Sequence, residues 1–258
     1  MLKRICLKCI GVFLAAGLAV VVPATPADAQ IIQISGSDAR NTINFNLGYF
    51  SLRGEDSRVD EDVLLVNLIG PPDDRDPFFE VLAFEVDDFN GATFGGEWLY
   101  AITENLEAGA GINFYQKTVP SVYRDLVDVD GTEIAQDLKL RVIPMVASVR
   151  FLPAGRGSVE PYIGAGIGFF NWRYSESGEF VDTATLEIFT NRYTKSGNAV
   201  GPVIVAGLRG VVEDVWTVGG EFRWQRAEGD TDREESGLVG DKIDLGGWNL
   251  NFTLGFRF

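Results

Sequence analysis

The last eleven residues, Trp248 to Phe258, constrain the fold more than any other stretch of the sequence. Large apolar side chains take every second position, and Asn, Thr, Gly or Arg fills the positions between them. The apolar set is Trp248, Leu250, Phe252, Leu254, Phe256 and Phe258. A period of two over this length predicts a β-strand with one apolar and one polar face. Six large apolar residues on one face are typical of the closing strand of a membrane β-barrel.

The same alternation recurs along the chain before this strand. It predicts seven earlier strands at residues 41–53, 91–102, 106–117, 134–151, 159–174, 200–212 and 216–226, with the eighth beginning near residue 242. The connections alternate between short turns (103–105, 152–158, 213–215) and long loops (54–90, 118–133, 175–199, 227–241). Short periplasmic turns and long extracellular loops are typical of bacterial outer-membrane barrels. The sequence therefore predicts an eight-stranded antiparallel transmembrane β-barrel.

Two of the long loops contain further segments with strand-like composition. These are Val63 to Val66 and Phe78 to Val86 in the first loop, and Phe180 to Tyr193 in the third. They predict either hairpins that extend beyond the bilayer or one additional pair of strands, so a barrel of ten strands is the alternative. A separate irregularity lies at Pro144, where the apolar phase of residues 134–151 changes, and this change predicts a β-bulge.

Alternation alone does not say which face meets lipid, because a secreted lipocalin-like barrel also alternates, with its apolar face inward. The polar face here carries mostly Gly, Asn and Thr with a few charges of both signs, which favours a narrow lumen filled by side chains. We predict that these charges form an interior polar plug, since unpaired charges in such a lumen would be costly. The plug residues are Glu97, Glu107, Arg209, Glu221 and Arg223, and Arg257 is a further charge of this face. A cation-conducting or substrate path is the alternative interpretation.

The N-terminal segment has the layout of a secretory signal peptide. A basic start precedes an apolar core at residues 10–22, which is too short for a spanning helix, and a small-x-small cleavage site, Ala27-Asp28-Ala29. We predict a signal peptide at residues 1–29, a periplasmic lead-in at 30–40, and a barrel domain at 41–258 located in the outer membrane of a Gram-negative-type cell.

Cysteine usage and charge limit the chemistry of the mature chain. Both cysteines, Cys6 and Cys9, fall in the signal segment, which excludes disulfides, thiolate metal sites and cysteine nucleophiles. The segment carries three basic residues and one acidic residue, so its removal changes the formal charge from −15 to −17. Binding to nucleic acid or to anionic lipid would need a basic patch, and none is visible in the sequence.

Acidic runs at residues 60–62, 73–74, 87–88 and 230–235 all fall in predicted loops. We interpret them as solvated loop surface, with weak divalent-cation binding beside lipopolysaccharide as the alternative. The segment Asp128 to Gly131 resembles half of an EF-hand loop, but its first ligand position would be Leu126 and its twelfth Asp137. We therefore predict no metal site and no cofactor.

The chain contains no histidine. General-base activation of serine near neutral pH normally needs such a group, and several enzymes built on outer-membrane barrels rely on it. A hydrolase that uses only carboxylates is the alternative, and nothing in the sequence argues for one. We therefore predict that the protein is not an enzyme and has no catalytic residues.

Two segments carry a resemblance to a known superfamily. Pro161 to Phe170, after a Pro/Gly turn, resembles the mid-barrel strand of small OmpA/OmpW-like outer-membrane proteins. Thr253 to Phe258 is similar to the polar-x-Gly-φ-x-φ signal that the barrel-assembly machinery recognises. The resemblance implies an assembly signal formed by Trp248, Leu250, Phe252, Leu254, Gly255, Phe256 and Phe258. Within the OmpW-like group it implies a channel for small hydrophobic compounds, and the anchoring role of full-length OmpA is not implied.

These observations predict an integral outer-membrane barrel with a structural or surface-interaction role and long acidic extracellular loops. Its expected partners are outer-membrane lipid and lipopolysaccharide and, during biogenesis, the barrel-assembly machinery and periplasmic chaperones. We expect a monomer that binds no nucleic acid. An OmpW-like barrel for the passage of small or hydrophobic solutes and a secreted lipocalin-like ligand-binding barrel are the alternatives.

Overall fold

The computed structural model describes residues 39–70, 82–182 and 185–258. The predicted signal peptide and all but the last two residues of the predicted lead-in lie outside the described residues. No helix among the described residues is long and apolar enough to cross a membrane.

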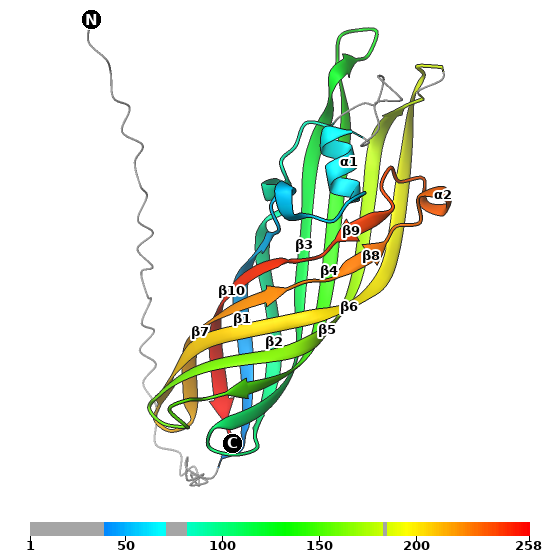
Figure 1. Ribbon diagram of the computed structural model, residues 1–258. Helices are drawn as coiled ribbons and strands as arrows, with labels where there is room; N and C mark the ends of the chain where they lie inside the picture. Colours follow the sequence, from blue (N-terminus) through cyan, green and yellow to red (C-terminus); the bar gives the residue numbers. More distant parts are fainter. Residues whose placement is uncertain (1–38, 71–81, 183–184) are drawn as a thin grey trace, which may run out of the picture. The chain divides into compact units, whose positions relative to one another are not determined.

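Eight antiparallel strands close into a barrel in the order β1-β10-β7-β6-β5-β4-β3-β2, which confirms the predicted fold (Figure 1). The strands are β1 (Asn41–Leu52), β2 (Gly91–Ala101), β3 (Leu106–Val127), β4 (Glu133–Phe151), β5 (Val159–Val181), β6 (Ile188–Val212), β7 (Trp216–Gln225) and β10 (Gly247–Arg257). The barrel closes where β1 pairs with β10. There the backbone N–H of Asn41 donates to the carbonyl of Phe258 (3.1 Å), and the N–H of Phe258 donates to the carbonyl of Asn41 (3.0 Å).

The strands differ in length, which the sequence predicted only through the hairpin expected at Phe180 to Tyr193, where β5 and β6 are indeed paired. β3, β4, β5 and β6 have 22, 19, 23 and 25 residues, whereas β1, β2, β7 and β10 have 10 to 12. The predicted loops 118–133 and 175–199 are therefore wrong for most of their length, because the only described residues in them that lie outside strands are 128–132, 182 and 185–187. The four long strands continue past the other four as an extended wall (Figure 1). We call this end of the barrel the loop end and the opposite end the turn end.

Two long connections remain at the loop end: loop 1 (residues 53–90) and loop 4 (residues 226–246). Loop 1 contains η1 (Glu55–Ser57), α1 (Val63–Ile69) and η2 (Val86–Phe89), and loop 4 contains β8 (Glu228–Asp230), α2 (Arg233–Ser236) and β9 (Lys242–Asp244). Val63 to Val66 is thus helical and not a strand, since Asp62 accepts a hydrogen bond from the backbone N–H of Leu64 and caps α1. Residues 78–81 of the other predicted segment lie outside the described residues. β8 and β9 form a separate two-stranded sheet, so the ring keeps eight strands and the ten-strand alternative is wrong.

The turn half of the barrel exposes its apolar face. The large hydrophobic side chains on its outer surface include Ile43, Phe45, Leu47, Phe94, Trp98, Met145, Val149, Ile163, Ile167, Phe169, Val200, Ile204, Leu208, Phe222, Leu250 and Phe252, each between 41% and 67% exposed. We call this surface the apolar belt. An apolar outer face is the arrangement of a barrel in lipid, and it is the reverse of a soluble lipocalin-like barrel.

The long strands reverse this polarity toward the loop end without changing their pleat. On β4, the even-numbered residues from Ile134 to Arg150 face inward throughout, including Pro144. The register between β4 and β5 continues through Pro144 opposite Phe170, so the predicted β-bulge is wrong. The apparent phase change arises because Leu138, Leu140 and Val142 fill an apolar interior near the loop end, whereas Met145 and Val149 face lipid nearer the turn end.

Candidate functional site

The interior of the turn half contains a buried network of ion pairs, which we call the charged layer. Its first group centres on Arg150, whose guanidinium contacts the carboxylates of Glu97 (2.7 Å) and Glu221 (2.6 Å). Glu221 also pairs with Arg223 at 2.8 Å and accepts a hydrogen bond from the hydroxyl of Tyr162 at 3.1 Å. All of these side chains are buried, so each charge depends on its neighbours in place of water.

A second group of the charged layer centres on Arg209. Its guanidinium contacts Glu107 and Glu160, each at 2.7 Å, and Glu160 also pairs with Arg257. The ring of Tyr162 lies between the two groups, because the guanidinium of Arg150 is 4.7 Å and that of Arg209 is 5.8 Å from its centroid. Cation–π contacts of this kind are stronger when they are shielded from water. The two groups therefore form one continuous layer across the lumen.

Strand register brings these residues together. Glu107 lies directly opposite Arg150 in the β3–β4 pair, and Glu160 lies opposite Arg209 in the β5–β6 pair. Glycines on the inner face provide the space: a Cβ on Gly207 would lie 2.4 Å from the hydroxyl oxygen of Tyr162. The lumen thus accommodates large charged side chains because the neighbouring inner-face positions are glycines.

All five residues predicted for the interior plug lie in the charged layer, and each is buried and ion-paired (Glu97, Glu107, Arg209, Glu221 and Arg223). Sequence reasoning missed Arg150, Glu160 and Tyr162, and it identified Arg257 as a polar-face charge without assigning it a partner. Strand alternation in the sequence could have identified these three residues. Since Val149 and Phe151 face lipid, strand alternation places Arg150 inside, and the same parity places Glu160 and Tyr162 inside on β5.

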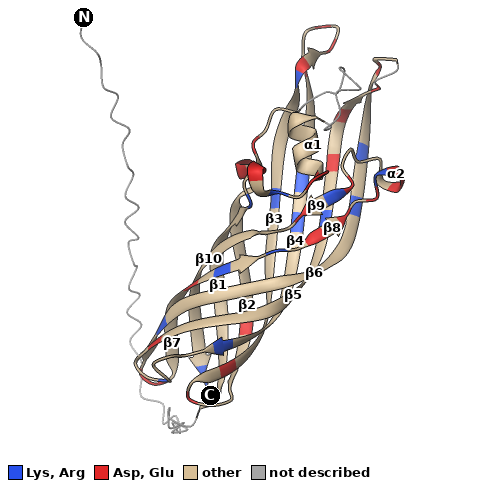
Figure 2. Cartoon of the chain, in the orientation of Figure 1, with Lys and Arg blue, Asp and Glu red and all other residues tan. Residues whose placement is uncertain are grey.

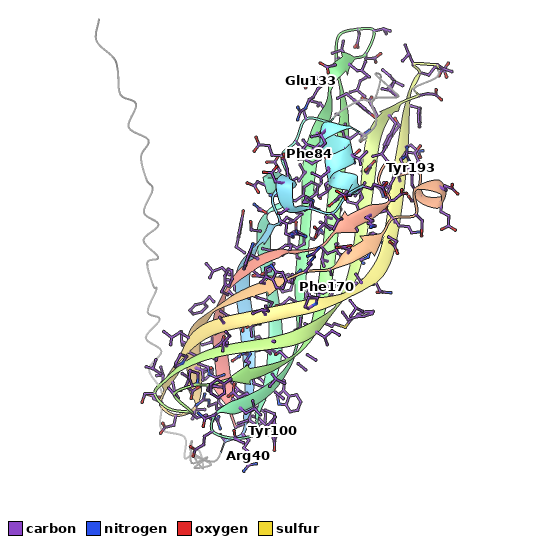
Figure 3. The ribbon with its side chains drawn as sticks, viewed as in Figure 1. Arg40, Phe84, Tyr100, Glu133, Phe170 and Tyr193 are labelled. Atoms are coloured by element: carbon purple, nitrogen blue, oxygen red, sulfur yellow. The ribbon has the colours of Figure 1, made fainter. Side chains whose placement is uncertain are left out.

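The interior of the loop half is filled by apolar side chains, which we call the apolar layer. The extended wall contributes Tyr115, Val119, Leu138, Leu140, Phe170, Trp172 and Tyr174, while loops 1 and 4 contribute Leu64, Leu68, Phe84, Phe89, Leu238, Ile243 and Leu245. Figure 3 shows Phe84 beside α1 and Phe170 on the strand that faces this region. The two loops therefore fold against the concave face of the long strands and close the loop end of the barrel.

A buried polar cluster holds loops 1 and 4 together. The Nε of Arg58 donates to the Asp62 carboxylate at 2.7 Å, and its Nη2 donates to the Asp244 carbonyl at 2.9 Å. The backbone N–H of Asp244 in turn donates to Asp62 at 3.2 Å, and Arg53 pairs with the Asp244 carboxylate at 2.8 Å. Burial raises the pKa of Asp62 above its ordinary value, although the guanidinium of Arg58 opposes this shift.

The acidic segments do not assemble into a metal centre among the residues that the structure describes. No group of three or more Asp, Glu, Cys or His side chains arranged to hold a metal ion is found there. In the turn at residues 128–132, the Asp130 carboxylate accepts hydrogen bonds from the backbone N–H (3.0 Å) and hydroxyl (2.7 Å) of Thr132. These bonds lower the pKa of Asp130 and give its carboxylate a role within the turn.

The residues predicted as an assembly signal all lie on β10 or just after it. Trp248, Leu250, Phe252, Leu254, Phe256 and Phe258 point outward and are 37% to 66% exposed. Gly255 points inward, where a Cβ would lie 2.0 Å from Oδ1 of Asn44 and 2.3 Å from Oγ1 of Thr217. Any larger residue at this position would force the side chains of Asn44 and Thr217 to move.

The closed ring, the apolar belt and the filled lumen define a membrane β-barrel of the small, side-chain-filled class. The chain belongs to the outer membrane protein beta-barrel domain family, whose family model matches residues 12–258.

Solved structures similar to the chain include two from Pseudomonas aeruginosa. They are the outer membrane protein OprG (11% identity, 85% of this chain and 96% of that chain, TM-score 0.47) and the N-terminal β-barrel domain of OprF (12%, 85% and 98%, TM-score 0.40). Neisserial surface protein A is also similar (12%, 87% and 98%, TM-score 0.43). A comparison with curated proteins found no match.

Proposed function

We propose that this protein is a sealed outer-membrane barrel with a structural or surface-interaction role, which presents its extended wall and acidic loops to the cell exterior. One observation carries the proposal: the lumen is filled by two successive buried layers, one charged and one apolar. A sealed barrel leaves the surface at the loop end as the part that can meet other molecules. Acidic residues lie there on the loops and hairpins, with basic residues among them (Figure 2).

Passage of small or hydrophobic solutes, the OmpW-like alternative, is less well supported. Solutes would have to separate Phe170, Trp172 and Tyr174 from the loops, although each of these side chains is at most 1% exposed. They would then meet the charged layer, where parting the ion pairs would strand buried charges. Enzymatic activity is not part of the proposal, because the chain lacks histidine and the carboxylates of the charged layer are held by arginines.

Planar-bilayer recording tests the seal directly. The refolded protein is expected to show no reproducible unit conductance, because both layers block the lumen. Heat-modifiable migration of the same sample on a gel verifies that the barrel is folded. An absence of conductance then cannot be attributed to failed refolding. Recurrent current steps of one size, from a sample that passes this control, would contradict the proposal.

Biogenesis requires further partners in this proposal. Periplasmic chaperones would deliver the chain as a monomer, and the barrel-assembly machinery would recognise the outward face of β10. Phe258 contributes to this face through a side chain that is 41% exposed and stacks on Phe256, with ring centroids 6.3 Å apart.

Substitution Phe258→Ser is expected to reduce insertion into the outer membrane while leaving secretion unchanged. It keeps the backbone, and hence the two hydrogen bonds with Asn41, so the effect isolates the side chain. Fractionation of cells, with quantification of folded protein in the outer membrane and of chain in the periplasm, measures the outcome. Val212→Ser, on the same outer face and 52% exposed, is the matched control. Equal insertion of wild type and Phe258→Ser would disprove the assembly role.

A further inference from the structure

The outer face of the extended wall carries a cationic cluster that the sequence did not reveal. Two adjacent rows of cross-strand neighbours run across β3, β4, β5 and β6: Gln116, Arg141, Arg173 and Ser196 in one, and Thr118, Lys139, Ser175 and Thr194 in the other. Three of these eight residues are cations, the other five are neutral and polar, and none is acidic. The expectation that the chain has no basic patch is therefore wrong. We call these residues the cationic rows.

The three cations have no counter-charge of their own. None of Lys139, Arg141 and Arg173 forms an ion pair with any residue that the structure describes. Arg141 and Arg173 lie directly opposite each other, and like charges in this position destabilise a sheet. The Nε of Arg141 is also buried and has no hydrogen-bond partner. Although the chain has a formal charge of −15, none of the carboxylates among its described residues is paired with these opposed cations.

The height of the cationic rows on the barrel is informative. The next row toward the turn end contains Ile143 and Asn171. The row after it contains Met145, Phe169 and Val200 of the apolar belt, with Ile112 beside them. Rows on one face are two residues apart, which is about 6.6 Å along a strand. The headgroup region of a bilayer is about 5–8 Å thick on each side of the hydrocarbon. Arg141 and Arg173 therefore lie about 6.6 Å along the strands beyond Ile143, at headgroup depth, and Lys139 lies one row further from the apolar belt.

Beyond the cationic rows toward the loop end lies a groove that is lined by none of the eight residues of these rows. It has a volume of about 320 Å³ and is lined by Ala83, Pro120, Ser121, Val122, Ala135, Gln136, Asp137, Ser177 and Gly178. Small and neutral side chains form most of this lining. Asp137 is the carboxylate nearest in sequence on β4, and it pairs with none of the three cations among the described residues.

We propose that Lys139, Arg141 and Arg173 form a binding site for the phosphate groups of a phosphorylated glycolipid of the outer leaflet. Arginine suits phosphate because its planar guanidinium donates two parallel hydrogen bonds. The hydroxyl and amide groups of Gln116, Thr118, Ser175 and Ser196 supply further partners for phosphate and sugar oxygens. Acyl chains of the same lipid would lie along the apolar belt below. This site is independent of whether the lumen is sealed.

The test compares lipids that differ only in phosphate. Protein refolded in detergent micelles is titrated with diphosphorylated lipid A and, separately, with dephosphorylated lipid A, and bound lipid is counted by native mass spectrometry. The double variant Arg141→Gln/Arg173→Gln is expected to weaken binding of the phosphorylated lipid about 30-fold, about fivefold for each cation near a membrane surface. Binding of the dephosphorylated lipid stays unchanged. Arg141→Lys/Arg173→Lys retains most of the affinity.

Two controls make the outcome decisive. Arg40→Gln/Arg233→Gln removes the same charge from exposed positions outside the cationic rows and is expected to leave affinity within twofold. Lys139→Gln, a single exposed substitution, is expected to cost about fivefold and provides a second variant if the double variant does not fold. Unchanged affinity in the cationic-row variants, or an equal loss in the control, overturns the proposal. Displacement of the lipid by an equal concentration of inorganic phosphate would show a free-anion site and overturn the assignment to lipid.

Discussion

Replacement of Arg150 by methionine is expected to lower the free energy of unfolding by about 3–5 kcal/mol, the cost of removing one partner from a buried ion pair. Arg150 is 1% exposed and bonds both Glu97 and Glu221. After the substitution Glu221 keeps Arg223, but Glu97 is left as a buried charge without an ion pair among the described residues. Denaturant unfolding of the protein refolded in detergent micelles measures the loss.

The double variant Glu97→Gln/Arg150→Met separates charge pairing from packing. It removes the stranded carboxylate, so stability is expected to recover at least half of the loss. Glu104→Gln, in an exposed turn, serves as the charge control and is expected to stay within about 0.5 kcal/mol of wild type. Equal losses in Arg150→Met and the double variant would show that stacking on Tyr162, and not ion pairing, explains the effect of Arg150.

The barrel was predictable because lipid contact leaves a local signal. Each outward position of β10 must be apolar, and the residues opposite must fit a narrow lumen, so the pattern from Trp248 to Phe258 contains both constraints within one strand. The same logic identified Glu97 and Glu221 as interior residues. Their partner Arg150 has the same parity, so the interior network was largely accessible to sequence reasoning.

The extended wall was not predictable by the same means. Beyond the apolar belt, Tyr115, Val119 and Tyr123 face inward and the polar residues face outward, which is the reverse of the pattern nearer the turn end. The period of alternation is two in both parts of the strand. In the sequence, a reversal of the apolar face therefore looks the same as a break in the strand, such as the bulge predicted at Pro144. What fills the concave face is α1 and loop 4, which are distant in sequence. That contact leaves no periodic signal in β3 itself.

The cationic rows show a second limit of the sequence. Lys139 and Arg141 lie on one strand and Arg173 lies on another, and the residues next to each in sequence are apolar or aromatic, as on any alternating strand. Only the register of β4 against β5 places Arg141 opposite Arg173. The net negative charge of the chain predicted that no basic patch exists, because an overall charge does not report a local concentration of cations.

The apolar layer can be tested at its largest buried side chain, Trp172, which is 1% exposed. The Trp172 ring lies against two glycines. A Cβ on Gly197 of β6 would be 2.9 Å from the ring, and a Cβ on Gly229 of β8 would be 2.4 Å from it. Trp172→Ala is expected to cost about 3–5 kcal/mol of unfolding free energy, because no neighbouring side chain at these glycines can fill the space. Denaturant unfolding in micelles measures this loss.

The same variant is expected to release loop 4 while the belt-bearing part of the barrel stays folded. The β8–β9 sheet packs over Trp172 through Gly229. Loss of the Trp172 side chain should therefore increase trypsin cleavage of loop 4 at Arg233 and Lys242. Trp248→Ala removes the same side chain from the outer face, where Trp248 is 45% exposed, and is expected to leave this cleavage unchanged. Equal trypsin cleavage of loop 4 in wild type and Trp172→Ala would show that the cluster of Arg58, Asp62 and Asp244 holds the loops without the apolar layer.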